Sequence, residues 1–260
     1  MTHHIGTPLK NIPPNILSHL TGLVRSQFQI DRKVISIHPV LEGENQASHF
    51  VMITEEDTHF GIKHSQGVEV EKMATEIAQL LKAPNACPTI FLENGIPLHP
   101  FKNKPIIITN WLYKSEIVRD IPKELLTNDL IPFFYQFGEW IAFSLLFGVR
   151  DRHQGNWVWS IDEKKLSMID MEESFGSAQY TDYLWAVIEF SNPERFKNPS
   201  DNQSEGLAFK NGVIAMVDKF KTERKHIAAI LSQKFVLQAF YNKWMELNED
   251  DFLRELFVGL

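Results

Sequence analysis

The first half of the chain alternates short apolar runs with turns, whereas the second half carries long apolar stretches with helical spacing. Runs rich in β-branched and aromatic residues, bounded by turn residues, predict strands at 34–41, 49–53, 59–63 and 104–112. The polar stretch 42–48 predicts the turn between the first two strands. Asn94-Gly95 predicts the turn of a hairpin over 89–98.

Helical periodicity appears in two segments of the first half and repeatedly in the second. Apolar residues at i, i+3, i+4 and i+7 predict helices at 15–30, 70–81, 132–148, 206–220, 223–246 and 249–257. Thr222 followed by Glu223 favours a new helix start at that point. Trp157–Ser160 and Leu166–Ile169 predict a hairpin within this helical half. Strands first and helices later indicate an α+β fold of two lobes.

Composition narrows the classes of function. The chain has 260 residues, 43% of them hydrophobic and 23% charged, and its formal net charge is −7. These values are typical of a globular protein, and the negative charge argues against non-specific binding to nucleic acid or to anionic membranes. The longest apolar stretch, 131–149, is interrupted by polar residues and predicts a buried helix rather than stable membrane insertion.

The lone Cys87 excludes an intramolecular disulfide, and the first residues lack the basic flank and apolar run of a signal peptide. We therefore expect a cytoplasmic protein. The cytoplasm of the producing cell and that of another cell are both compatible with this expectation.

Polar residues with a defined spacing follow the long apolar helix. Asp151 and Asn156 lie five residues apart, and Asp170 ends the short apolar run that comes next. Phosphoryl transfer needs one carboxylate to take the proton of the attacking hydroxyl, and oxygen ligands that hold Mg²⁺ against the phosphates. The spacing therefore predicts phosphoryl-transfer chemistry.

Several segments resemble the phosphoinositide 3/4-kinase and actin-fragmin-kinase branch of the protein-kinase-like superfamily. Residues 148–156, Gly-Val-Arg-Asp-Arg-His-Gln-Gly-Asn, are similar to its catalytic loop, and residues 168–176 to its metal-binding segment. Residues 43–51 resemble its phosphate-covering loop, although they contain one glycine where protein kinases have three. Residues 60–63 resemble the strand that carries the nucleotide lysine. The resemblance covers residues 41–176.

This resemblance implies an overall organisation. We expect a single bilobal kinase-like domain over 1–260, with an N-lobe over 1–110 that includes the nucleotide-binding loop and a C-lobe over 111–260. The expected cofactors are ATP and Mg²⁺.

The resemblance also assigns catalytic and metal-binding residues. Asp151 takes the catalytic acid or base position; His153 shares that role or orients the loop through hydrogen bonds. Asn156 and Asp170 form the Mg²⁺ pair.

Further residues are expected to bind the nucleotide. Lys63 contacts phosphate and needs a counter-charge, which Glu71 supplies, although Glu69 and Glu76 lie nearby. Backbone N–H groups from Asn45 to Ser48 cradle phosphate. Thr109 and Trp111 lie in the hinge that holds adenine, and Trp111 is equally compatible with a core position.

The stretch after Asp170 bears on the acceptor. Residues 170–190 contain no Lys or Arg but five carboxylates. An acidic surface repels an inositol phosphate headgroup, so a hydroxyl on a protein or a small molecule is the expected acceptor. A phosphoinositide kinase is the second hypothesis. Nucleotidyl transfer and a catalytically inactive kinase-like binding module are further alternatives, because a fold does not fix its chemistry.

Overall fold

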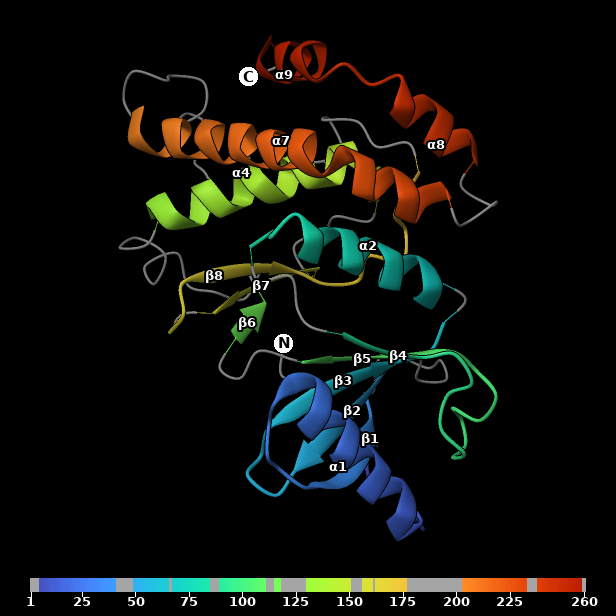
Figure 1. Cartoon of the computed structure of the whole chain (residues 1–260). Coiled ribbons are helices and arrows are strands. Elements are labelled where there is room, and N and C mark those ends of the chain that lie inside the picture. The colour runs from blue at the N-terminus through green and yellow to red at the C-terminus, as the bar shows by residue number, and fades with distance from the viewer. Residues whose placement is uncertain are drawn as a thin grey trace. The chain divides into compact units, whose positions relative to one another are not determined.

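The computed structural model shows an N-terminal five-stranded antiparallel sheet followed by a mostly helical part, which confirms the predicted α+β class (Figure 1). Contacts divide the chain into two compact units, Met1–Thr75 with Cys87–Ser115 and Glu76–Ala86 with Glu116–Leu260. The expected lobes, 1–110 and 111–260, stay a prediction. The structure describes residues 5–40, 49–65, 67–84, 89–110, 115–117, 130–150, 156–160, 162–176, 203–232 and 238–258.

The first unit is built on a sheet of strand order β1-β2-β3-β5-β4. Helix α1 packs against this sheet, and the two share one hydrophobic core (Figure 1). Helix α2 (Val68–Leu80) follows β3 and contributes residues to both units. The other elements are α1 (Pro14–Phe28), β1 (Val34–Pro39), β2 (His49–Thr54), β3 (His59–Lys63), β4 (Thr89–Leu92) and β5 (Ile106–Asn110).

Helix α1 shows why its sequence is helical. Pro14 stands at the first helical position, where its missing N–H is not needed. Ile16, Leu20 and Val24 recur every four residues and are buried against the sheet. The helix ends at Gln29, whose left-handed backbone closes it.

The predicted hairpin over 89–98 is wrong, because β4 pairs with β5 rather than with the residues that follow the turn. Gly95 does make the predicted turn, with a φ of +63°, and a Cβ there would lie 2.0 Å from the carbonyl oxygen of Phe101. The chain then makes a wider loop in which Phe101 is fully buried, its ring 4.7 Å from that of Phe50. Burial of this aromatic side chain favours the loop over an immediate return strand.

The second unit is dominated by helices α4 and α7, which lie side by side (Figure 1). A Cβ on Gly138 would lie 2.1 Å from the Phe209 carbonyl oxygen, and one on Gly212 would lie 1.9 Å from that of Tyr135. The two backbones therefore touch where they cross, which only glycine permits. The bounds are α4 (Leu130–Leu146), α7 (Gln203–Ser232), α8 (Gln238–Met245) and α9 (Glu249–Val258).

A small second sheet has the order β6-β7-β8. Its strands are β6 (Ser115–Ile117), which the sequence did not predict, β7 (Trp157–Ser160) and β8 (Lys165–Met168). Strands β7 and β8 form the predicted hairpin.

The predicted helix start at Thr222 is also wrong, because α7 runs through it. The Thr222 hydroxyl donates 2.9 Å to the carbonyl oxygen of Asp218, one turn back in the same helix, rather than capping a new one. A continuous apolar stripe outweighs the local signal, since the buried side chains of α7 continue past this point: Phe209, Val213, Met216, Val217, Phe220, Ile227 and Leu231. Within the described ranges, no helix combines the length and apolarity needed to cross a membrane.

Candidate functional site

A buried ion pair joins β3 to α2 in the first unit. Lys63 ends β3, where it is paired with His49 of β2 and Ile107 of β5. Its Nζ lies 3.2 Å from Oε2 of Glu71, and each side chain is 8% exposed. Removing two charges from water costs several kcal/mol per ion, so this pair is expensive to keep for stability alone.

In the second unit, the β7–β8 hairpin brings Asn156 beside the end of β8. Trp157 is directly opposite Met168 in the ladder, and the N–H of Ile169 donates 3.0 Å to the carbonyl oxygen of Asn156. Asn156, which is 5% exposed, therefore lies opposite Ile169, and Asp170 follows Ile169 directly. The two residues predicted to bind Mg²⁺ are neighbours within this unit.

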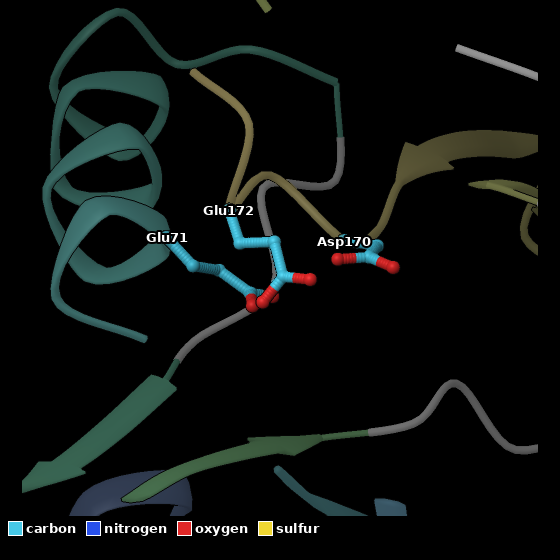
Figure 2. A group of neighbouring side chains, drawn as sticks. All are labelled: Glu71, Asp170 and Glu172. Carbon is cyan, nitrogen blue, oxygen red and sulfur yellow. The ribbon is translucent and has the colours of Figure 1, made fainter. Parts of the chain in front are cut away.

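Asp170 and Glu172 lie on the segment that follows β8 (Figure 2). Asp170 has a φ of +60°, a left-handed conformation that aspartate tolerates better than most residues. One carboxylate oxygen of Asp170 lies within 4.8 Å of one of Glu172, and both side chains are half-buried. Two carboxylates and the Asn156 amide are oxygen donors of the kind that Mg²⁺ prefers.

Backbone hydrogen bonds tie Phe147 and the first residues of the 148–156 motif to the segment after Asp170. The N–H of Arg150 donates 2.8 Å to Glu173, that of Phe175 donates 2.7 Å to Phe147, and that of Gly176 donates 3.0 Å to Gly148. A Cβ on Gly148 would lie 2.0 Å from the Gly176 carbonyl oxygen, and its φ is +56°. Glycine is therefore required at the first position of the motif.

A second buried ion pair lies between α4 and α7. Lys219 Nζ is 2.6 Å from Oε1 of Glu139, whose side chain is 5% exposed. Burial raises the pKa of Glu139, and its bond to Lys219 opposes that rise. Burial, together with the charge of Glu139, also raises the pKa of Tyr135.

Several predicted site residues lie outside the described part of the chain: Asp151, His153, Asn45, Ser48 and Trp111. Thr109 is half-buried on β5, opposite Gly61 of β3 and Thr89 of β4. The roles assigned to all these residues stay predictions. The structure brings Lys63 to Glu71, and it brings Asn156 to Ile169, the residue before Asp170.

The sequence interpretation did not assign Glu172 as a ligand, although an Asp-x-Glu spacing places two carboxylates on one short segment. It also gave no role to Glu139, the one charged residue of the mostly apolar helix α4. A charge in such a position predicts a buried counter-ion, which is Lys219.

Comparison with known proteins matches no family model and no curated protein. A function for this chain is therefore inferred from these side chains and their surroundings.

Proposed function

We propose that this protein is an ATP- and Mg²⁺-dependent phosphotransferase of the protein-kinase-like kind. It moves the γ-phosphate of ATP to a hydroxyl acceptor, and its two units are the two lobes of that fold.

The observation that carries the proposal is the buried Lys63–Glu71 pair. In protein kinases a lysine on the third strand pairs with a glutamate on the following helix, and the pair must be formed for catalysis. Lys63 ends β3, Glu71 lies on α2, and their charged atoms are 3.2 Å apart. Holding an ammonium group in place for nucleotide phosphates gives a functional reason for burying two charges that stability does not require.

Asn156 and Asp170 are proposed as the Mg²⁺ ligands, with Glu172 as a third oxygen donor. The β7–β8 ladder ends next to both backbones, since the N–H of Ile169, the residue before Asp170, donates to the carbonyl oxygen of Asn156. Mg²⁺ bound there would neutralise charge on the β- and γ-phosphates.

Asp151 is proposed to accept the proton of the acceptor hydroxyl, with His153 as the alternative base. The acceptor oxygen forms a bond to the γ-phosphorus while the bond from that phosphorus to the β,γ-bridging oxygen breaks, and ADP leaves. Arg150 and Asn156, which flank residues 151–155 within the catalytic-loop motif 148–156, are both bonded to the 169–176 segment. These bonds hold the two residues on either side of 151–155 against the segment that carries Asp170.

The acceptor is proposed to be a protein or small-molecule hydroxyl. Residues 170–190 carry five carboxylates and no basic residue, a charge pattern that repels inositol phosphates.

Labelled ATP tests this proposal and separates its alternatives. The protein with Mg²⁺ and [γ-³²P]ATP is incubated with a cell lysate, with a lysate metabolite fraction and with phosphoinositide vesicles. Parallel reactions contain [α-³²P]ATP. We expect γ-label alone to enter the lysate protein or the metabolites, and Asp170→Asn to abolish the transfer. Transfer of α-label would instead establish nucleotidyl transfer, and γ-label in lipid alone would establish a phosphoinositide kinase.

A matched control is Glu163→Gln, which removes an exposed carboxylate from the turn of the same hairpin. This variant should keep full transfer. Absence of transfer to every acceptor, together with no Mg-ATP binding, would refute the proposed function.

A further inference from the structure

Helix α2 is divided between the two units after Thr75, so its first turns and its last turn have different surroundings. The first turns carry Glu71, whose carboxylate meets Lys63 in the first unit. The last turn belongs to the second unit, where Lys219 of α7 bonds to Lys82, two residues past the helix end. Because α2 is one continuous helix, a contact that holds its C-terminal end also restrains the position of Glu71.

The end of α2 has a defined geometry. Lys82 has a left-handed backbone with a φ of +48°, its N–H donates 3.0 Å to Gln79, and the N–H of Ala83 donates 2.9 Å to Ala78. This bond pattern is a Schellman motif, which reverses the chain after the helix. The carbonyl of Lys82 accepts a 3.0 Å bond from Lys219 Nζ.

Lys219 is itself held in place. Its Nζ also donates 2.6 Å to Glu139 Oε1, and the buried Glu139 side chain comes from the middle of α4. Because Glu139 is 5% exposed, moving Lys219 away would leave a buried carboxylate without its counter-charge. One ammonium group therefore links three segments: α7, which carries it, α4 through the Glu139 carboxylate, and the turn that closes α2 through the Lys82 carbonyl.

We infer that Lys219 is a positioning residue, which fixes α2 so that Glu71 is presented to Lys63. Glu71 lies nine residues before the helix end at Leu80, about 14 Å along the axis, so a tilt of the last turn displaces its carboxylate. The effect on catalysis rests on the proposed function, whereas the anchoring of α2 does not.

Hydrogen exchange tests the anchor. Lys219→Met alone strands the Glu139 charge, so the informative variant is Lys219→Met with Glu139→Leu, which replaces the pair by apolar groups. We expect this double variant to fold, to exchange the amides of 76–84 about tenfold faster, and to leave the β7–β8 hairpin unchanged. Unchanged exchange in 76–84 would overturn the inference.

Two further variants separate anchoring from charge burial. Glu139→Gln keeps an oxygen acceptor and leaves the Lys219–Lys82 bond available, so exchange in 76–84 should match the wild type. Lys221→Met removes an exposed lysine from the same helix, whose partner is Asp250, and should also have no effect on 76–84. Faster exchange in either control would show that loss of the bond from Lys219 to the Lys82 carbonyl does not cause the faster exchange of the double variant. That result would overturn the inference.

Mg-ATP affinity gives the functional readout. We expect the double variant to raise the Kd for Mg-ATP by about five- to tenfold, with Glu139→Gln close to the wild type. An unchanged Kd together with faster exchange would mean that the anchor does not position Glu71, and would overturn the positioning role. A wild-type protein that fails to bind Mg-ATP would refute the proposed function, while the exchange experiment would still decide whether Lys219 holds α2.

Discussion

Among the residues that the structure describes, Glu71 and Glu139 are buried glutamates that each pair with a lysine, and the two pairs differ in what surrounds the charges. In the first unit, both members of the Lys63–Glu71 pair are 8% exposed and their charged atoms are 3.2 Å apart. In the second unit, Lys219 is 33% exposed, lies 2.6 Å from Glu139 and makes an additional bond to a backbone carbonyl. The second pair thus removes one charge from water and keeps the other partly solvated.

If the proposed function holds, this difference separates a pair kept for phosphate binding from one kept for structure. Two fully desolvated charges seldom repay their desolvation, whereas a half-solvated lysine that also closes a helix end stabilises its surroundings. We therefore interpret Lys63–Glu71 as part of the proposed phosphate-binding machinery, and Lys219–Glu139 as the anchor of α2.

Replacing one or both members of these two ion pairs gives the largest expected effects on stability. Lys219→Met strands a buried carboxylate and should lower the free energy of unfolding by about 3–5 kcal/mol, while adding Glu139→Leu should recover most of the loss. Replacing both Lys63 and Glu71 by Met and Leu should leave the stability equal to the wild type or higher, yet abolish Mg-ATP binding. Urea denaturation and nucleotide titration measure both quantities. Retained Mg-ATP binding in the Lys63/Glu71 double variant would contradict the assignment of this pair to phosphate binding.

The close backbone contact of α4 and α7 offers a second test, because the Lys219–Glu139 pair joins the same two helices. Gly212→Ala places a Cβ 1.9 Å from the Tyr135 carbonyl oxygen, so it should cost about 1–3 kcal/mol or more in unfolding free energy. Gly206→Ala is the matched control on the same helix, because a Cβ there meets nothing within 4 Å. It should stabilise the protein by about 0.5–1 kcal/mol. Equal effects from the two substitutions would contradict the observed crossing.

A smaller effect is expected from pH. The pKa of Glu139 is raised by burial in the folded protein, so the folded state holds this proton more tightly than the unfolded chain does. Stability that Glu139 contributes at low pH is therefore lost as pH rises from the unfolded pKa through the raised folded pKa.

Glu139→Gln should abolish that loss, so the stability of the wild type relative to this variant should fall with rising pH across the window. Chemical denaturation of both proteins over a pH series measures the difference. A wild type that gains stability relative to Glu139→Gln over the same window would show that the Lys219 charge outweighs burial.

Local patterns were sufficient to predict much of the fold. Strands β3 at His59–Lys63 and β7 at Trp157–Ser160 begin and end where the sequence predicted, because alternating apolar residues and flanking turns are local signals. The pairing of β4 with β5 was not predicted, since it depends on the burial of Phe101 in the intervening loop. The continuity of α7 was missed because a capping signal at Thr222 is weaker than the packing of a whole helix face.

The candidate site shows the same limit. Lys63, Asn156 and Asp170 were recognised from short spacings within a motif. The Glu139–Lys219 contact joins residues 80 positions apart, and no local period reveals such a pair. The buried charge of Glu139 in an apolar helix predicts that a partner exists, but tertiary packing decides which residue it is.

The most direct test of the central claim is the Kd for Mg-ATP, measured by isothermal titration calorimetry on the wild type and four variants. Lys63→Met and Asp170→Asn should each raise the Kd by about a hundredfold or more, which corresponds to about 2.7 kcal/mol. Lys33→Met and Glu163→Gln alter an exposed lysine and an exposed carboxylate in the two units and should leave the Kd unchanged. Binding that survives in both site variants, or that is absent from the wild type, would contradict the account.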